Sequence, residues 1–527
     1  MGKMVVVGRS GILIAVLGLA ACYAQGNGRV VRTDAGAVRG GHAAKPGVTV
    51  FKGIPFAAPP VGPLRWRPPQ PVKQWSGVRP AAEFGASCIQ HEVKELLPWT
   101  EEFMTHNEVS EDCLFLNVWT PHAARSVHLP VVVFIHGGAF TSGAGGIAIY
   151  DGTDLAATGL VVVTINYRLG VFGFFAYPEL TAESEHQSSG NYALLDQIAA
   201  LQWVKRDIAG FGGDPNRVMI WGQSAGAFSV NDLLASPLAA GLFERAMADS
   251  GIGITGQSMP DLKSADEAGM KFAEAHHADS LKALRDLPAD DLLNATQGGM
   301  GRFSPIVDGW VLPDTPLALM AKDADNDVPV ITGYQANDGL LFSRPVQTPD
   351  QYIEMAKRQY GEMADEFLRL YPAKTADEAK EMVAQSIRDR DRVSMYLWAS
   401  RRESNHHAPV FTYYFDRAIP WPQHAEFGAF HSGELPYFFL NLRVMDRPWE
   451  KQDRNLAQTA ATYLKNFAAT GNPNGDHLPQ WAPVSKAKPA TMEIGARTGE
   501  MPLADGERLG FWERFLSSPT GAHAPPF

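Results

Sequence analysis

The chain has 527 residues, 45% of them hydrophobic and 10% aromatic, which is ample for a large buried core. Its 46 basic and 57 acidic residues give a formal net charge of −11, and no basic stripe is available for a nucleic-acid partner. The sequence contains no internal repeat and no low-complexity segment.

Residues 1–24 have the features of an export signal. Basic residues precede an apolar run at 11–21 that is too short and wrongly flanked for a membrane span. The end of this run, 19–22, reads Leu-Ala-Ala-Cys and resembles a bacterial lipoprotein box, in which Cys22 is lipidated after cleavage. The alternative is ordinary cleavage after Ala24, which leaves a soluble protein. Either way we expect an exported protein (periplasmic, secreted or lipid-anchored) whose membrane contact is limited to an anchor at Cys22.

Cys88 and Cys113 are the cysteines that remain after the signal. In an oxidising compartment, a lone pair this close in sequence is expected to form a disulfide. The loop between them carries Trp99 and several acids, for which we favour a solvated face. The alternative is that these acids line the mouth of a cleft and attract cationic substrates. They are Glu92, Glu95, Glu101, Glu102 and Glu108.

Short strands and turns rich in Pro and Gly follow the signal, and beyond them strand-like runs alternate with helical segments. Residues 131–135 and 160–165 are dense in β-branched residues and uncharged, as expected for strands covered on both faces. Residues 191–208 have apolar residues at helical spacing. Further strands are expected at 218–221, 328–332 and 410–415, and helices at 227–235, 350–370, 376–401 and 456–467.

This alternation predicts an α/β fold with a large, mostly parallel central sheet and helices on both faces. Because no linker stands out after residue 50, we expect residues 27–527 to form a single catalytic domain.

The pentapeptide Gly-Gln-Ser-Ala-Gly at 222–226 lies between an expected strand and an expected helix. In that context G-x-S-x-G predicts a nucleophile, Ser224, on a sharp turn that its flanking glycines permit. The hydroxyl would stand at the head of a helix, whose free N–H groups favour negative charge. An alcohol is a poor nucleophile at neutral pH, so a base and an oxyanion site are also required. Alone, the pentapeptide is equally compatible with a plain glycine turn.

The strand at 131–135 runs directly into His-Gly-Gly-Ala-Phe at 136–140. Glycines after a strand leave backbone N–H groups unobstructed, which is what a developing alkoxide needs. We therefore assign the N–H groups of Gly138 and Ala139 as two oxyanion donors and that of Ala225 as the third. The alternative is a purely structural strand-to-loop turn.

A carboxylate and a histidine must follow the serine in this order of the chain. Asp338 lies in a loop just after the strand at 328–332, at the end where α/β sheets place ligands. Its sequence, Asn-Asp-Gly, is also a common turn. Asp323 and Asp327 precede the strand and so lie at its wrong end. His431 lies among small residues, just before an apolar aromatic segment.

Several further segments carry a resemblance: FKGIP at 51–55, EDCLFLN at 111–117, NYRLGVFGF at 166–174, FGGDP at 211–215, GAFHSGELPY at 428–437, NFA at 466–468 and GNPNG at 471–475. With the serine pentapeptide, they make the chain similar to type-B carboxylesterases. This is the cholinesterase-like family of α/β-hydrolases, which includes bacterial para-nitrobenzyl esterases. The match covers nearly everything after the signal.

The resemblance implies an α/β-hydrolase fold and assigns the roles of the triad. Ser224 is the nucleophile, His431 the general base and then acid, and Asp338 the orienting acid. It also implies a Cys88–Cys113 bridge. Phe140 and Phe342 would lie beside the acyl group, although both are equally compatible with ordinary core aromatics. Buried ion pairs with a scaffolding role are implied between Arg65 and Glu111 and between Arg168 and Asp196.

Three positions depart from the family pattern. Many members have Glu where this chain has Asp338, so its loop must approach the histidine more closely. Ala139 stands where a third glycine is usual, which keeps the N–H donor but narrows the space beside it. Gln223 stands where cholinesterases have Glu, so a negative charge useful for a quaternary ammonium is absent from this substrate-binding position.

We therefore predict a serine carboxylic-ester hydrolase that acts on small or medium apolar esters through an acyl-enzyme. Uncharged imidazole is required, so activity should rise with pH through an apparent pKa near ~6–7. No cofactor, metal or nucleic-acid partner is expected, and the protein would be a monomer or homodimer. The alternatives are an amidase or lactonase with the same triad and a non-catalytic binding or adhesion protein on the same fold.

Overall fold

The computed structural model describes residues 1–2, 28–92, 94–121, 127–254, 259–296, 303–340, 346–405 and 407–522. The predicted export signal, including Cys22, and the predicted pocket residue Phe342 lie outside these ranges. Across the described ranges, every helix is too short or too polar to cross a lipid bilayer.

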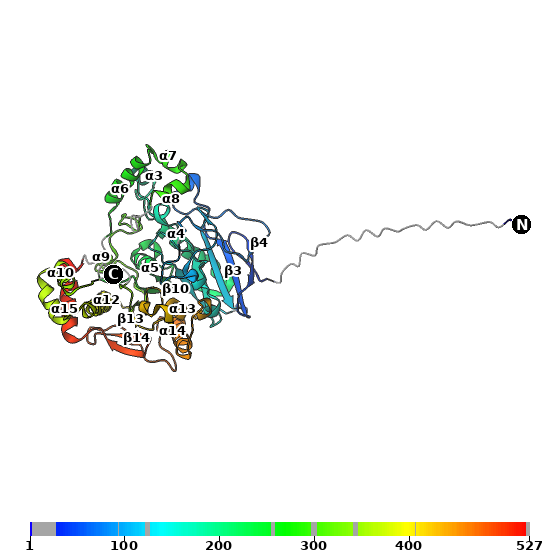
Figure 1. The fold of residues 1–527 in the computed structure, drawn as a ribbon. Helices are drawn as coiled ribbons and strands as arrows, with labels where there is room; N and C mark the ends of the chain where they lie inside the picture. Colours follow the sequence, from blue (N-terminus) through cyan, green and yellow to red (C-terminus); the bar gives the residue numbers. More distant parts are fainter. Residues whose placement is uncertain are drawn as a thin grey trace.

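A large β-sheet runs through the described residues in the order β1-β2-β3-β7-β9-β8-β10-β11-β12-β13-β14-β15, with β4 paired to β2 (Figure 1). Adjacent strands from β9 to β14 are parallel, and antiparallel pairs complete both margins. This arrangement confirms the predicted mostly parallel α/β sheet. The strands are β1 Val30–Arg32, β2 Ala37–His42, β3 Val48–Pro55, β4 Val78–Ala81, β5 Ser87–Cys88, β6 Val109–Ser110, β7 Phe115–Pro121, β8 Leu129–Ile135, β9 Val161–Ile165, β10 Gly213–Gln223, β11 Arg245–Asp249, β12 Val330–Gln335, β13 Val410–Phe415, β14 Ala490–Ile494 and β15 Thr498–Pro502.

Helices cover both faces of this sheet because its central strands are apolar on both faces. In β8, Val131, Val133 and Ile135 join the core that packs against α4, α5 and α12, whereas Val132 and Phe134 join the core on the α13 and α14 side (Figure 1). The helices are α1 Thr153–Ala156, α2 Gly170–Phe174, α3 Pro178–Glu183, α4 Tyr192–Asp207, α5 Ala225–Ala235, α6 Leu262–Ala275, α7 Leu281–Asp286, α8 Ala289–Asn294, α9 Pro316–Met320, α10 Pro349–Tyr360, α11 Ala364–Leu370, α12 Ala376–Asn405, α13 Leu435–Phe438, α14 Lys451–Thr470, α15 Gly506–Leu516 and α16 Pro519–Ala522.

Most predicted elements are found near their predicted positions. The predicted strands correspond to β8, β9, β10, β12 and β13, and the long predicted helices to α4, α5, α12 and α14. The helix expected at 350–370 is wrong as a single element. It is divided into α10 and α11 at Gly361, whose φ of +56° is incompatible with a continuing right-handed helix.

Two ion pairs brace the fold, as the family resemblance implies. Arg168 binds Asp196 through Nε and Nη2, each at 2.7 Å, and its Nη1 donates to the Arg67 carbonyl at 2.9 Å. Arg65 binds Glu111 through two contacts of 2.7 Å. Each pair is bidentate, and the Arg168–Asp196 pair is almost completely buried.

Replacing Arg168 by Met should destabilise the protein by about 3–5 kcal/mol, because Asp196 would remain buried without a counter-charge. Arg369→Met is the matched control, since Arg369 pairs with Glu507 at 2.8 Å in an exposed position and should cost less than about 1 kcal/mol. Urea unfolding of both variants measures the difference. Equal losses would contradict a scaffolding role for the Arg168 pair.

Candidate active site

Ser224 occupies a sharp turn between β10 and α5. Its backbone has φ +57° and ψ −124°, outside the helical region, and α5 begins at the next residue. A Cβ on Gly222 would lie 2.1 Å from the Gly226 carbonyl oxygen, and one on Gly226 would lie 2.0 Å from that of Ile135. The turn therefore needs glycine at both positions, and it leaves Ser224 half-buried at the head of α5.

His431 and Asp338 form a buried hydrogen-bonded pair. The Nδ1–H of His431 donates to Oδ1 of Asp338, and the two residues are 4% and 1% exposed. The other carboxylate oxygen, Oδ2, accepts from the Ser250 hydroxyl at 2.6 Å and from the Gln335 N–H at 3.0 Å. With Nδ1 protonated, Nε2 of the neutral ring carries the lone pair.

The loops that carry this pair are joined to each other. After β12, the Ala336 N–H donates to the Phe415 carbonyl at 2.8 Å, and the Asn337 N–H donates to the Ala429 carbonyl at 3.0 Å. The acid loop is thus bonded to the segment that ends in His431. These bonds hold the Asp338 loop close to His431, which is necessary because the side chain of Asp is shorter than that of Glu.

The Nε2 atom of His431 is contacted by the neighbour of Ser224. The amide Nε2 of Gln223, a residue that is 2% exposed, lies 3.2 Å from it. The structure thus brings residues 223, 338 and 431 into contact, with Ser224 one residue away on the same turn.

The loop after β8 has an unusual backbone at the three residues that follow Gly137. Gly138, Ala139 and Phe140 have φ of +105°, +53° and +61°. The Gly138 carbonyl accepts from the N–H groups of Thr141 and Ser142 at 2.9 and 3.0 Å, so this carbonyl points toward the interior of its own loop. Within the described chain, the N–H groups of Gly138, Ala139 and Ala225 donate to no protein acceptor. They are available to an anion.

His136 supports this loop through a hydrogen bond and a ring contact. Its Nδ1–H donates to the Gly137 carbonyl at 2.8 Å, and its ring stacks on Tyr167 with centroids 4.3 Å apart. The Tyr167 hydroxyl donates to the His136 carbonyl at 2.6 Å. Complete burial lowers the pKa of His136 to about 4, so its ring stays neutral at the pH values where imidazole bases work.

A disulfide joins Cys88 and Cys113, as the sequence predicts. The loop that it closes carries Trp99, whose indole N–H donates to the His431 carbonyl at 3.1 Å. The two rings meet edge to face, with centroids 6.3 Å apart. The disulfide loop therefore forms one wall beside His431.

The acids of the disulfide loop divide into two kinds. Four are exposed, which fits the predicted solvated face: Glu92, Glu95, Glu101 and Glu108. Glu102 is instead half-buried and lies 3.8 Å from Arg447. Phe140, the other predicted pocket aromatic, is 8% exposed, and its ring meets Phe174 edge to face at 5.2 Å.

Comparison with known proteins assigns the family. Residues 27–512 match the model of the carboxylesterase family. The chain is 35% identical to a fumonisin B1 esterase of Sphingopyxis macrogoltabida, over 91% of this chain and 88% of that protein. It is 36% identical to a para-nitrobenzyl esterase of Bacillus subtilis (strain 168), over 85% of this chain and 91% of that one. The chain belongs to the carboxylesterase family.

The fold agrees with this assignment. A solved structure of a PNB esterase superposes with a TM-score of 0.77 at 31% identity, covering 92% of this chain and 99% of that one. A second PNB esterase structure gives 0.75 at 32% identity, with the same coverage. The α/β-hydrolase fold and a carboxylesterase activity predicted from the sequence are both confirmed.

Further carboxyl groups lie buried behind Asp338 in this carboxylesterase. Asp249 accepts from the Trp221 indole N–H at 2.6 Å, and burial raises its pKa to about 7. Burial, and then the charge of Asp249, raise the pKa of Glu434 well above its usual value. Burial likewise raises the pKa of Asp391, which binds Arg390, to about 6. The charge of Asp338 contributes to all three shifts, so these carboxyl groups belong to one electrostatic cluster.

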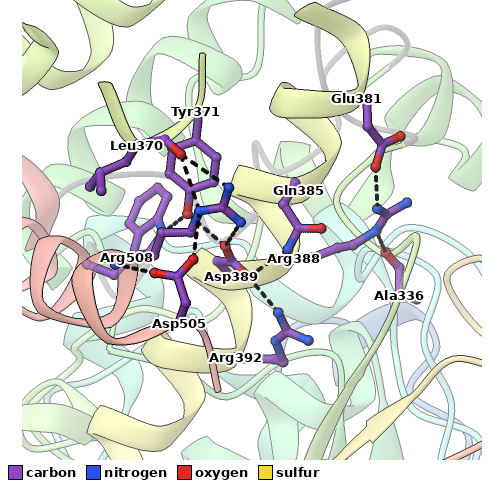
Figure 2. Close-up of polar contacts among 11 residues, drawn as sticks. Ala336, Leu370, Tyr371, Glu381, Gln385, Arg388, Asp389, Arg392, Asp505 and Arg508 are labelled. Carbon is purple, nitrogen blue, oxygen red and sulfur yellow. Dashed lines mark hydrogen bonds and ion pairs between the residues drawn. The ribbon is translucent and has the colours of Figure 1, made fainter. Parts of the chain in front are cut away.

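Helix α12, which carries Asp391, also holds the acid loop in place. Arg388 donates through Nε to the Ala336 carbonyl and through Nη1 to Glu381, both at 3.2 Å (Figure 2). One residue further along α12, Asp389 accepts from the Tyr371 hydroxyl and from Gln385, both at 2.8 Å (Figure 2). These contacts fix α12, and through Ala336 they fix the start of the loop that bears Asp338.

The residues that support the His431–Asp338 pair were not predicted from the sequence. Ser250 follows β11. This strand was not predicted because charged residues stand at both of its ends, so Ser250 was not recognised as a residue that follows a strand. Its Asp-Ser-Gly sequence and its φ of +57° mark a strand-to-loop turn next to that of Ser224. The Ser-Gly dipeptide is the one local signal that was present. The contact of Trp99 with His431 spans 332 positions and has no local signal.

Asp249→Asn should change the pH dependence of stability. In the folded protein the pKa of Asp249 is raised to about 7 from 3.8. The protonated carboxyl therefore stabilises the fold fully below pH 4, and this stabilisation is lost as the pH rises toward 7. The amide removes this loss while keeping an acceptor for Trp221. The melting temperature of the variant minus that of the wild type should therefore increase between pH 4 and 7 and stay constant above pH 7. Each pKa unit corresponds to about 1.4 kcal/mol of stability. A constant offset across this range would contradict the assigned shift.

Proposed function

We propose that this carboxylesterase hydrolyses small or medium apolar esters through an acyl-enzyme on Ser224. In this mechanism His431 acts as general base and then general acid, and Asp338 orients it. The observation that carries the proposal is the buried His431–Asp338 hydrogen bond, with Nε2 directed to the turn that bears Ser224. This arrangement supplies the correct tautomer, because the proton on Nδ1 leaves Nε2 free to accept another.

Acylation begins when Ser224 Oγ attacks the ester carbonyl carbon and its proton passes to Nε2 of His431. The carbonyl oxygen becomes an oxyanion, for which the N–H groups of Gly138, Ala139 and Ala225 are the proposed donors. Asp338 offsets the positive charge of the imidazolium. His431 then returns the proton to the alkoxy oxygen as the carbon–oxygen bond breaks, releasing the alcohol and leaving Ser224 acylated.

Deacylation repeats these steps with water. His431 takes a proton from water as the hydroxyl attacks the acyl carbon, and the second oxyanion occupies the same three N–H groups. Collapse returns the proton to Ser224 and releases the carboxylic acid. The support for the oxyanion site is the left-handed backbone at residues 138–140, which directs the Gly138 carbonyl into its own loop.

An apolar acyl group is favoured by the aromatic Phe140 next to the proposed oxyanion site. The relatives of the chain are named for fumonisin B1, for cocaine and for a para-nitrobenzyl ester, so their names support ester hydrolysis in general rather than one substrate. Gln223 supplies no negative charge for a cationic alcohol. We therefore infer a preference for neutral esters over choline esters.

We also propose that the enzyme is exported and that residues 27–527 act as one catalytic domain. The Cys88–Cys113 disulfide supports export, because such bonds persist in oxidising compartments. The family match over residues 27–512 supports a single domain.

Ser224→Ala should abolish labelling by a fluorophosphonate and lower kcat/KM for a short-chain nitrophenyl ester by at least about 10⁴-fold. Ser229→Ala is the matched control, because Ser229 is buried on the same helix, where it accepts from Gln197 at 3.0 Å, and it should keep both properties. Labelling that persists in Ser224→Ala would place the nucleophile elsewhere. Faster cleavage of a matched nitroanilide than of the ester would make the enzyme an amidase.

Activity on a neutral ester should rise with pH through an apparent pKa near ~6–7, because only the neutral imidazole can accept the serine proton. His136 cannot produce this rise, since its pKa is lowered to about 4. A pH profile of kcat/KM measures it. A flat profile between pH 4 and 8 would exclude histidine as the general base.

A further inference from the structure

Gln223 is a buried amide at the working nitrogen of the proposed base. Its side-chain nitrogen, Nε2, lies 3.2 Å from Nε2 of His431, on the side of the ring opposite to Asp338. Neutral imidazole has one lone pair, at Nε2, and general-base catalysis needs that lone pair for the Ser224 proton. The amide of Gln223 therefore competes with the serine hydroxyl for the same acceptor.

When the ring is protonated, the amide N–H of Gln223 can no longer donate to Nε2. An imidazolium carries N–H at both nitrogens, so the amide N–H would then face a second donor. Rotation of the amide by about 180° exchanges its nitrogen for its oxygen, and this terminal torsion is broad and roughly two-fold. The oxygen can then accept from Nε2–H. Glutamine alone among the uncharged residues of its length offers both groups from one side chain.

The backbone around the amide leaves space for its oxygen. A Cβ on Gly137 would lie 3.1 Å from Gln223 Oε1 and 3.0 Å from Ser224 Cβ, which is tighter than ordinary contact. The absence of a side chain at residue 137 therefore keeps the carbonyl end of the amide uncrowded. Gly137 also follows His136, whose bond to the Gly137 carbonyl fixes this strand end.

We propose that Gln223 is a switchable positioning residue for His431, whose amide donates to the neutral imidazole and rotates to accept from the imidazolium. This inference deepens the proposed function and rests on it, because it concerns the same serine mechanism. Gln223 thereby serves both protonation states of the ring. The amide adds no charge beside the ring, whereas a carboxylate at this position would stabilise the imidazolium.

The titratable groups around the His431–Asp338 pair come from several elements. Asp249 lies at the end of β11, Glu434 immediately precedes α13, and Asp391 with Arg390 lies on α12. The Trp99 ring on the disulfide loop is neutral. All of these stay in place when residue 223 alone is changed, so a difference between variants reports on residue 223.

The variants separate the two halves of the switch. Gln223→Glu retains only an acceptor, so its charge should move the acid limb of the kcat/KM profile, measured relative to the plateau of the same variant, about one pH unit upward. Gln223→Leu retains neither group, so its plateau should fall about tenfold with no upward movement of the limb. A packing role alone would not move the limb. Limbs that coincide in the wild type and both variants would overturn the proposal.

Asp249 needs its own control because its pKa, raised to about 7, falls within the range of the profile. The same comparison is therefore repeated in an Asp249→Asn background. The upward movement caused by Gln223→Glu should persist there. Its disappearance would show that Asp249, and not Gln223, sets the limb, and would overturn the proposal.

A spectroscopic measurement on the wild type does not depend on the folding of any variant. In enzyme labelled with ¹⁵N in its glutamine side chains, the Gln223 amide signal should change with the same midpoint as the downfield proton between His431 Nδ1 and Asp338. An amide signal that stays constant through that titration would overturn the proposal. This measurement needs no ester turnover. If the two signals titrate together but the enzyme shows no esterase activity, the proposed function fails while the switch at Gln223 stands.

Discussion

The hydrogen bond from His431 to Asp338 is the interaction on which the site depends. Two residues 93 positions apart meet in the interior, where an unpaired charge would be costly. Asp338 is held by the Ser250 hydroxyl and by the Gln335 N–H, and Ala336 is held by Arg388. This support makes the imidazole tautomer a property of the fold rather than of the side chain alone.

The parallel sheet explains why these residues meet. Strands β8, β10 and β12 all end at the same edge, and each continues into a segment with site chemistry: the Gly-Gly loop, the serine turn and the acid loop. Helix α5 begins directly at the serine turn, and its free N–H groups would favour the negative charge of the proposed oxyanion. The acidic cluster of Asp249 and Glu434 lies behind the pair, where raised pKa values limit the negative charge at neutral pH.

The sequence was most informative where function imposes local geometry. The turn around Ser224 requires Gly222 and Gly226 for reasons of backbone space, and these glycines appear directly as a motif. The buried strands β8 and β9 were predictable because both of their faces are apolar. Long-range contacts were different. The bond from Trp99 to His431, the hydroxyl of Ser250 on Asp338 and the amide of Gln223 on Nε2 arise from tertiary packing, and no local spacing encodes them. The helix at 350–370 failed for a local reason, since one glycine with positive φ divides it.

A crystal structure of the enzyme after reaction with a phosphonate ester would show directly whether Ser224 is the nucleophile. We expect phosphorus bonded to Ser224 Oγ and a phosphoryl oxygen within hydrogen-bond distance of the N–H groups of Gly138, Ala139 and Ala225. His431 should remain bonded to Asp338 through Nδ1. An adduct on another side chain, or a phosphoryl oxygen directed away from those N–H groups, would contradict the proposed mechanism.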